Sequence, residues 1–497
     1  MVVGVQKSIG ISRSRITMAT TEFWLNDQLV STDAPQGLLV LDYLRRHEHL
    51  VGTKEGCKEG DCGACAILIG RLDGDGVRYE PVTSCLVPLG EMQGRHVVTI
   101  EGINLEGLSP VQQAVVDFGG TQCGYCTPGF IVSMTWYLMA EQGEPTLEGM
   151  QRAISGNLCR CTGYASINRA SESLVDKFGE SGPWADIWAA DDRVSALVDA
   201  EMLPAYFTEM PERLRQIEAP ELEHDGDITD FFVAGGTDIY VQQGERIPGA
   251  SVKMLNHLPL MRGVRREKGE FRVGALTTFE EFRADEGIQG LIPRIDDFMF
   301  LIASLHIRNR ATLGGNIVNA SPIGDMTNML LALGTRLVLS DGEAEREVAM
   351  KDFFLDYKVL DRRPAELITE IVFPEGTDAT RINFEKLSKR KALDIATVCS
   401  GFRCEASADG VIEEVGISMG GVAPTPLYLE ETCEFLVGRT IDCDTVREAT
   451  KIAMGEASPI SDVRGSADYK RLLVRQFLIA HFTECYPERV RFAELAS

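Results

Sequence analysis

Three cysteines stand at C-x4-C-x2-C in the stretch GTKEGCKEGDCGAC, and a fourth follows alone in TSCLVPL. These residues are Cys57, Cys62, Cys65 and Cys85. The spacing is typical of a plant-type [2Fe–2S] cluster, which four thiolates hold. A zinc ion usually takes paired C-x2–4-C motifs, which this set fits poorly. A cluster is therefore favoured over zinc or plain structural thiols.

The first cysteine loop is rich in glycine, with Gly52, Gly56, Gly60 and Gly63. A loop that wraps an iron–sulfur cluster must turn its backbone N–H groups inward. Such turns need left-handed backbone conformations, which glycine adopts most readily. Inward amides also attract an anion, and the cluster carries negative charge. We expect all four glycines to supply left-handed conformations.

A second set of four cysteines follows at C-x2-C and C-x-C, namely Cys123, Cys126, Cys159 and Cys161. Each pair stands beside the end of an expected helix, and the capping-box sequence Ser109–Gln112 starts the helix before them. A C-x2-C pair also marks redox-active cysteines and zinc sites, so these alternatives stay open. The tight C-x-C pair suits a tetrahedral zinc poorly, and no expected strand precedes Cys123 as in a thioredoxin-like site. The pattern favours a second cluster in an all-helical domain.

The chain has 497 residues and a formal net charge of −25, which argues against a nucleic-acid binder. It contains no apolar run near the roughly 20 residues that a membrane helix needs. Eight of its 13 cysteines belong to the two sets, and no signal peptide precedes them. We therefore expect a reducing, cytoplasmic location, with neither nucleic acid nor membrane as a partner.

Two glycine loops lie in an expected α/β region, AGGTD at residues 234–238 and ATLGGNI with SPIGD at residues 311–325. Small residues let backbone amides approach phosphate oxygens, although each glycine pair can equally be an ordinary turn. No G-x-G-x-x-G occurs, so a Rossmann dinucleotide site is not supported. Further on, Lys386, Lys389, Arg390 and Lys391 form a basic cluster in an acidic chain. It is either a solvated strand edge or a phosphate-attracting patch.

Together these motifs resemble the molybdenum hydroxylase family. The resemblance rests on the first cysteine set, QCGYCTPGF (122–130), GNLCRCTGY (156–164), the two glycine loops and SDVRGSADYKRLLV (461–474). The fused order, two clusters and then flavin, is similar to the small subunit of bacterial xanthine dehydrogenases. The implied fold is multidomain α+β. Its parts are a disordered extension (1–20), a ferredoxin-like [2Fe–2S] domain (21–100), a helical [2Fe–2S] domain (101–180), a linker (181–222), an α/β FAD-binding domain (223–380) and an α+β C-terminal flavoprotein domain (381–497).

The resemblance also implies roles for single residues. The first cysteine set would hold the cluster nearer the flavin, and the second set the cluster nearer a molybdenum–molybdopterin cofactor on a partner chain. Gln122 would touch that cofactor, and Lys386 would be a catalytic residue beside the isoalloxazine ring. The expected FAD contacts are Ala234, Gly235, Gly236, Thr237, Asp238, Thr312, Gly314, Gly315, Asn316, Ser321 and Asp325, together with Lys386.

The implied function is electron transfer. Electrons from xanthine or hypoxanthine, oxidised to urate at the partner's molybdenum, would pass through both clusters to FAD and then to NAD+. A heterotetramer of two small and two large chains is implied. Leu393 precedes Asp394 where vertebrate relatives carry a second acid, which leaves the acceptor, NAD+ or oxygen, open. The alternatives are a sister hydroxylase acting on an aldehyde or N-heterocycle, and a zinc-stabilised, non-catalytic assembly module.

Overall fold

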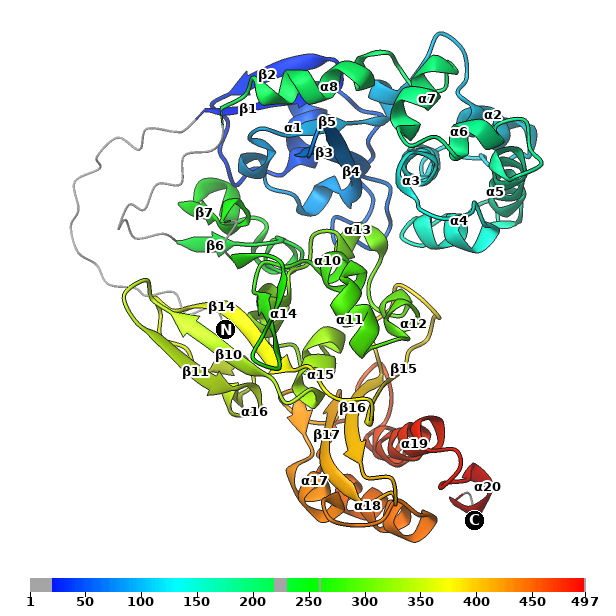
Figure 1. Cartoon of the computed structure of the whole chain (residues 1–497). Coiled ribbons are helices and arrows are strands. Elements are labelled where there is room, and N and C mark those ends of the chain that lie inside the picture. The colour runs from blue at the N-terminus through cyan, green and yellow to red at the C-terminus, as the bar shows by residue number, and fades with distance from the viewer. Residues whose placement is uncertain (1–19, 219–229, 259–260, 496–497) are drawn as a thin grey trace, which may run out of the picture. The chain divides into compact units, whose positions relative to one another are not determined.

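The computed structural model describes residues 20–218, 230–258 and 261–495, which divide into two compact units (Figure 1). The N-terminal unit contains the described residues up to Leu258 and the short segment Ser304–Arg310. The C-terminal unit contains residues 261–303 and 311–495. The expected extension, residues 1–20, lies outside the described residues except for its last position.

The N-terminal unit begins with a five-stranded sheet of order β2-β1-β5-β3-β4. Phe23 and Leu25 alternate with more exposed residues along β1, so one face of the sheet is apolar. That face packs against Tyr43 and Leu44 of helix α1 (Val40–Arg46). The first cysteine loop then connects α1 to β3. The strands are β1 (Thr21–Leu25), β2 (Gln28–Thr32), β3 (Ala66–Asp73), β4 (Gly76–Thr83) and β5 (His96–Val98).

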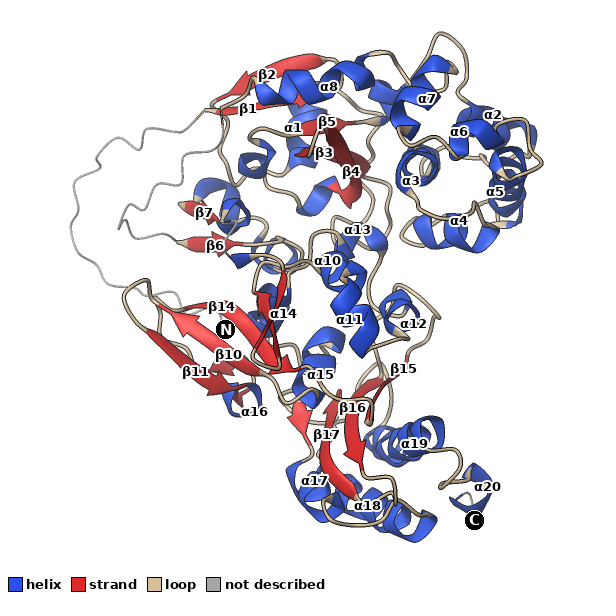
Figure 2. Cartoon of the chain, in the orientation of Figure 1, coloured by secondary structure: helices blue, strands red, loops and turns tan. Residues whose placement is uncertain are grey.

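A helical part follows, and its first helices gather beside this sheet (Figures 1 and 2). The expected capping box starts it, because the Ser109 side chain accepts a 3.3 Å hydrogen bond from the Gln112 amide and the Gln112 side chain accepts one of 2.9 Å from the Ser109 amide. The helices are α2 (Pro110–Asp117), α3 (Thr127–Ala140), α4 (Leu147–Ala153) and α5 (Ala165–Phe178). The C-x2-C motif lies between α2 and α3, and the C-x-C motif between α4 and α5.

The described part of the expected linker, residues 181–218, contains regular structure, contrary to the expectation of a plain linker. Three helices lie there, α6 (Ala185–Trp188), α7 (Arg193–Asp199) and α8 (Tyr206–Arg215). Phe207, Met210 and Leu214 are buried in the core that also holds the side chains of α3 and α5. Pro211 lies inside α8, and this packing outweighs its local cost. The other domain boundaries stay predictions.

The N-terminal unit is completed by two short parallel strands, β6 (Phe231–Val233) and β7 (Val252–Met254). Helix α9 (Ile239–Gln243) lies between them in the sequence. Phe231, Val233 and Tyr240 share a core with Cys65, Cys85 and Leu86 of the ferredoxin-like part. The last element of the unit is α13 (Leu305–Arg308).

The described part of the C-terminal unit contains two larger antiparallel sheets and a two-stranded one of β12 (Phe354–Asp356) and β13 (Val359–Leu360). The first has the order β11-β10-β14-β9-β8, and the second the order β15-β16-β17-β18. The second sheet packs against the closing helices. The strands are β8 (Val264–Glu267), β9 (Glu270–Gly274), β10 (Arg336–Ser340), β11 (Glu345–Ala349), β14 (Leu367–Pro374), β15 (Thr380–Leu387), β16 (Val398–Ala406), β17 (Ile412–Gly420) and β18 (Leu427–Tyr428). The helices that concern the site and the core are α12 (Ile295–Phe300), α14 (Leu313–Asn319), α15 (Asp325–Ala332), α17 (Glu430–Leu436), α18 (Cys443–Glu456) and α19 (Ala467–Cys485).

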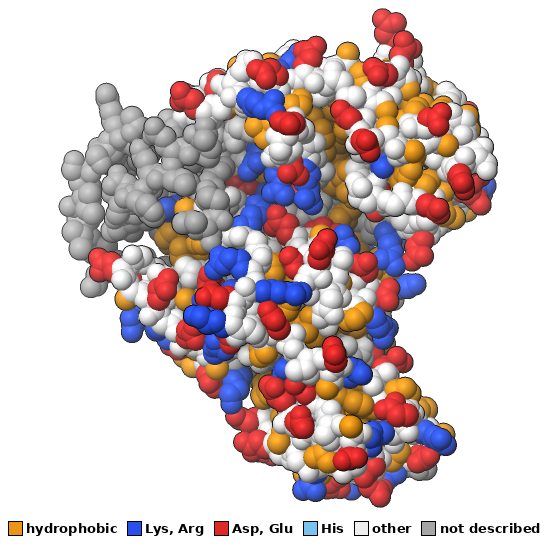
Figure 3. All heavy atoms as spheres, in the orientation of Figure 1, with side chains coloured by type: hydrophobic (Ala, Val, Ile, Leu, Met, Phe, Trp, Pro, Cys, Tyr) orange, Lys and Arg blue, Asp and Glu red, His pale blue; other side chains and the backbone are white. Residues whose placement is uncertain are grey.

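None of the described helices is long and apolar enough to cross a membrane. On the face drawn in Figure 3, acidic and basic side chains are interspersed over the surface.

Candidate iron–sulfur and flavin site

The four cysteines of the first set meet as two pairs of thiols. Cys57 contacts Cys62, and Cys65 contacts Cys85. Cys65 and Cys85 are buried, with 2% and 1% of their surface exposed. Backbone amides point at the sulfurs, since the Cys57 amide donates to Cys62 Sγ at 3.4 Å and the Glu59 amide donates to Cys57 Sγ at 3.4 Å. Inward amides of this kind stabilise negative charge on sulfur.

Each pair holds one acidic and one weakly acidic thiol. The hydrogen bond with Cys62 lowers the pKa of Cys57 to about 5, and the same bond raises the pKa of Cys62. The bond between Cys65 and Cys85 likewise lowers the pKa of Cys65 and raises that of Cys85. Binding of a cluster needs all four sulfurs as thiolates, because only thiolates act as ligands.

Two of the four glycines in this loop adopt left-handed conformations, Gly60 at φ +81° and Gly63 at φ +64°. The prediction was wrong for Gly52 and Gly56, whose φ values are not in that region. At these two positions glycine is required for another reason, because there is no room for a side chain. A Cβ at Gly56 would lie 2.6 Å from Cys62 Sγ, and one at Gly52 would lie 2.5 Å from Ile100 Cγ2.

The second set also forms two pairs of thiols. Cys126 contacts Cys159, and Cys123 contacts Cys161. Thr162 donates its hydroxyl to Cys159 Sγ at 3.1 Å and its amide at 3.5 Å. Burial opposes ionisation of Cys159, but these hydrogen bonds prevail and lower its pKa, whereas burial raises the pKa of Cys126 to about 12.

Solvent reaches the second set far more than the first. Cys123 and Cys161 are exposed, and Gln122 beside them is exposed as well. Tyr125 and Tyr164 add exposed apolar surface next to these cysteines, with 47% and 38% of their surface accessible.

Pairwise contact suits a two-iron cluster, in which two thiolates bind each iron. In the described part of the chain, no three His, Cys, Asp or Glu side chains form a site for a single metal ion. The donor chemistry of both sets thus fits [2Fe–2S] clusters. All 13 cysteines are free thiols.

The first glycine loop, Ala234–Asp238, follows β6 and lies against Leu86. Gly236 has φ +78°, and a Cβ on it would lie 2.6 Å from the backbone oxygen of Leu86, the residue after Cys85. Arg310 donates to the carbonyl of Gly235 at 3.2 Å and forms an ion pair with Glu91, which is only 3% exposed. The loop is thereby fixed next to a cysteine of the first set.

Sequence reasoning missed Asn256 beside this loop. Its side-chain amide donates to the Ala234 carbonyl at 3.0 Å, while its Oδ1 is buried without a hydrogen-bond partner. Such an acceptor fits a donor group of a bound cofactor, because buried polar atoms are rarely unsatisfied. The available signal was its place after β7, since the ends of the parallel strands β6 and β7 meet at one edge.

The second glycine loop and Lys386 lie in the C-terminal unit. Thr312 caps α14 by accepting the Gly315 amide at 3.2 Å, and a Cβ on Gly314 would lie 2.8 Å from that of Ala275. Asn316 Oδ1 accepts the Thr327 hydroxyl at 2.8 Å. Ser321 Oγ accepts only a long bond, 3.4 Å, from the Ile323 amide. Asn316 and Thr312 thus stabilise the loop itself.

Lys386 is buried and forms an ion pair with Asp325. Its Nζ lies 2.7 Å from Asp325 Oδ2 and donates to the Leu301 carbonyl at 2.7 Å, and its side chain is 1% exposed. Burial raises the pKa of Asp325, and Lys386 opposes this shift by stabilising the carboxylate. The structure joins these two predicted residues, whereas contact of either with a flavin stays a prediction.

The expected basic cluster is not a single patch. Lys386 points inward to Asp325, and Arg390 lies 3.6 Å from the Asp394 carboxylate, which also accepts its amide. Lys389 donates to the Val463 carbonyl, and Lys391 lies over the Phe300 ring. The physical reason is that Lys386 belongs to β15, where alternate side chains face the interior, while the other three follow the strand.

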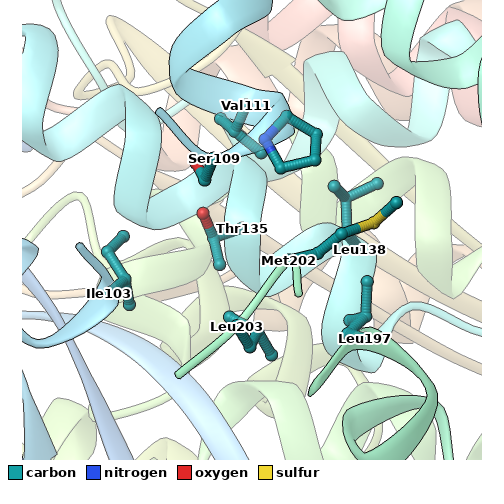
Figure 4. A pocket seen from close by; sticks show the side chains of 9 residues that line it. Ile103, Ser109, Val111, Thr135, Leu138, Leu197, Met202 and Leu203 are labelled. Atoms are coloured by element: carbon teal, nitrogen blue, oxygen red, sulfur yellow. The ribbon is translucent and has the colours of Figure 1, made fainter. Parts of the chain in front are cut away.

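A small cavity lies in the helical part of the N-terminal unit (Figure 4). It measures about 10 Å³, close to the least that one water molecule needs. Thr135 Oγ1 is buried there without a partner. None of the cysteines lines the cavity, whose walls are Ile103, Ser109, Pro110, Val111, Thr135, Leu138, Leu197, Met202 and Leu203. It holds no group suited to redox chemistry.

Four family models match successive parts of the chain. They are the 2Fe-2S iron-sulfur cluster binding domain (24–89), the [2Fe-2S] binding domain (99–172), the FAD binding domain in molybdopterin dehydrogenase (219–376) and the CO dehydrogenase flavoprotein C-terminal domain (384–485).

Among curated proteins, aldehyde oxidase 1 of Oryctolagus cuniculus is 28% identical over 93% of this chain and 39% of its own length. Xanthine dehydrogenase 1 of Arabidopsis thaliana is 28% identical over 90% of this chain and 38% of its own length. The chain thus spans well under half the length of these relatives. Among solved structures, a carbon monoxide dehydrogenase chain from Hydrogenophaga pseudoflava is 26% identical over 52% of this chain and 89% of that chain, with a TM-score of 0.49. Together with the paired thiols, the matched models show that this chain carries two [2Fe–2S] domains, an FAD-binding domain of the kind in molybdopterin dehydrogenase and a C-terminal domain of the CO dehydrogenase flavoprotein type.

Proposed function

We propose that this chain is the electron-transfer part of a xanthine dehydrogenase. Electrons would arrive from a molybdenum centre on a partner chain that oxidises xanthine or hypoxanthine, and would leave through FAD to NAD+. The observation that carries this proposal is the contrast between the cysteine sets. Two cysteines of the first set are buried near the Ala234–Asp238 loop, and two cysteines of the second are exposed beside Gln122.

Each part of the chain has its own task in this proposal. When bound, the clusters would supply one-electron transfer, and the flavin would supply hydride chemistry, which combines two electrons with a proton. The first cysteine loop donates amides to sulfur and excludes water around Cys65 and Cys85. Arg310 holds the Gly235 carbonyl in place. Each glycine loop is proposed as an FAD contact within its own unit.

The molybdenum-binding partner would dock on the surface around Gln122, Tyr125, Cys161 and Tyr164. These residues are exposed in the isolated chain, and the two tyrosines are suited to an interface because they bury apolar area and keep a polar end. A heterotetramer of two small and two large chains, in the cytoplasm, completes the proposal. The 13 free cysteines support a reducing compartment.

NAD+ is the proposed acceptor, and Lys389 and Lys391 are the proposed attraction for its phosphates because both are exposed in an acidic chain. In the assembled enzyme, Lys389→Ala and Lys391→Ala should each raise the KM for NAD+ without changing flavin reduction by purine. Lys451→Ala, at an exposed lysine of α18, serves as the control. NAD+ kinetics that stay unaltered in both variants would contradict this assignment.

The division of labour is tested by expressing the chain alone. Purified by itself, it should reduce an artificial dye with NADH and should not oxidise xanthine or hypoxanthine. Adding the molybdenum-binding partner should bring purine oxidation. Purine turnover by this polypeptide alone, or failure of the partnered enzyme to use purines, would refute the proposal.

A sister hydroxylase is the second candidate, because the rabbit aldehyde oxidase matches as well as the plant xanthine dehydrogenase, at 28% identity each. Substrate choice would then belong to the partner. Turnover of aldehydes or N-heterocycles by the assembled enzyme, with none of purines, would favour this candidate.

A further inference from the structure

The loops that hold the two cysteine sets touch each other through their backbones. The Leu158 amide donates to the Cys62 carbonyl at 2.9 Å. Cys62 belongs to the first set, and Leu158 directly precedes Cys159 of the second. A path of covalent bonds interrupted by one hydrogen bond thus joins a cysteine of one set to a cysteine of the other.

Glycines make this contact possible. A Cβ on Gly63 would lie 2.4 Å from the Gly156 carbonyl, and a Cβ on Gly129 would lie 2.2 Å from the Gly63 carbonyl. Any side chain at these positions would push the two loops apart, because real Cβ atoms do not approach so closely. The glycines therefore let the backbones of the two loops come into direct contact.

A series of buried hydrogen bonds supports this contact between the two loops. His306 Nε2 lies 2.8 Å from Ser133 Oγ, which donates its proton to Asn157 Oδ1 at 2.8 Å. The Asn157 side-chain amide then donates to the Gly63 carbonyl at 3.1 Å. Because the single Ser133 proton is already used, Ser133 accepts from His306, and Nε2 of the imidazole must carry a hydrogen.

His306 is fully buried and reaches this position from outside the cysteine motifs. It belongs to α13, within the part of the chain that matches the FAD-binding family model. Its ring lies against Gly156, where a Cβ would be 2.6 Å from Nδ1. Burial lowers its pKa to about 4, with Arg308 adding to the shift, so the ring is neutral at physiological pH.

We propose that His306, Ser133 and Asn157 are positioning residues that fix the contact between the two cluster loops and thereby govern electron exchange across it. The inference rests on the proposed function and adds the group that controls one of its steps. In that step, one cluster loses one electron and the other gains it, with no proton or other reactant consumed. The hydrogen-bonded chain acts only by holding the Leu158 amide on the Cys62 carbonyl.

The test compares variants of the assembled holoenzyme by electron paramagnetic resonance and by rapid kinetics. His306→Leu removes the donor to Ser133, while His306→Gln keeps an N–H group of similar reach. In the fully reduced protein, magnetic interaction between the two clusters splits their resonance signals. This splitting should change in His306→Leu and should stay unchanged in His306→Gln. Electron passage from the second cluster to the flavin should slow by about tenfold or more in His306→Leu, the size typical of removing a group that orients a metal ligand.

His481 provides a matched control in the other unit. It too is fully buried, with Nε2 2.8 Å from Ser400 Oγ, which in turn donates to the Ser418 carbonyl at 2.8 Å. His481→Leu should lower thermal stability at least as much as His306→Leu, because it leaves a buried hydroxyl without its donor and also loses the bond between His481 Nδ1 and the Asn383 side-chain amide. It should leave the splitting unchanged. A purely structural role for His306 would make the two variants alike in every measurement.

The outcomes separate this inference from the proposed function. An unchanged splitting and rate in a His306→Leu protein with full iron and sulfide would overturn the inference and leave the proposed function standing. Absence of both clusters from the unchanged protein would overturn both. If His306→Leu fails to hold its clusters, Ser133→Ala, which deletes one hydroxyl from the same chain, decides by the same two readouts.

Discussion

The two cysteine sets present the same four thiols in two different surroundings. In the first, Cys65 and Cys85 are 2% and 1% exposed and share a core with Val233 and Tyr240 near the glycine loop. In the second, Cys123 and Cys161 lie at the surface. Reduction potentials of iron–sulfur clusters depend on solvent exposure and on hydrogen bonds to sulfur. The same set of four thiolate ligands can therefore form a buried, inner cluster site and a surface, outer cluster site in one chain.

The two cysteine sites also differ in the contacts that hold them in place. Around the inner set, Leu86 meets Gly236, and Arg310 pairs with Glu91. In the outer set, Thr162 donates to Cys159 within one turn, while Leu158 donates to Cys62 of the inner loop. Because Cys65 and Cys85 are buried, the inner site should tolerate less change than the outer one.

Removing one ligand from each set should produce the largest effects. Cys85→Ala and Cys161→Ala should each reduce the content from four iron and four sulfide per chain to about two of each, because a [2Fe–2S] cluster needs four ligands. Only Cys85→Ala should also clearly lower the unfolding temperature, since that side chain is buried in a core. Equal destabilisation of both variants would contradict the inner–outer contrast.

Glycine substitutions should give the next largest difference. Gly63→Ala combines φ +64° with a Cβ 2.4 Å from the Gly156 carbonyl and should cost about 3–5 kcal/mol, from strain together with overpacking. Gly124→Ala shares a positive φ, +81°, but its Cβ would meet only Thr121 Oγ1 at 4.0 Å. It should cost about 1 kcal/mol. Denaturant unfolding measures both, and equal costs would argue against the close contact of the loops.

Breaking the ion pair of the inner site should have a smaller effect. Arg310→Met leaves the buried Glu91 carboxylate without its partner and should cost about 2–3 kcal/mol, somewhat less than for a fully buried pair. It should also weaken FAD retention, because Arg310 holds Gly235. Arg152→Met, at a surface pair with Glu148 in α4, is the control and should cost about 0.5 kcal/mol or less. Flavin content that stays the same in Arg310→Met would separate Arg310 from the cofactor.

The division of the cysteines into two sets and the start of α2 were predictable because their signals are local. Ligand spacing is encoded within each motif, and the capping box Ser109–Gln112 combines with Pro110 within four residues. The fold class was predictable for the same reason, through the change from strand-like to helical periodicity between the first two domains.

The features that could not be predicted depend on contacts between residues far apart in the sequence. Ser133 and His306 are 173 positions apart, and no pattern predicts their hydrogen bond. Pro211 suggested a linker, but the buried face of α8 overrides it. Lys386 looked like one of four clustered charges, and only strand alternation and the presence of Asp325 turn it inward.

Elemental and flavin analysis of the purified protein shows whether one chain holds two iron–sulfur clusters and a flavin. We expect four iron, four acid-labile sulfide and one FAD per chain, as two [2Fe–2S] clusters require. Zinc bound to the thiols, with neither sulfide nor flavin, would contradict it and identify a zinc-stabilised assembly module instead.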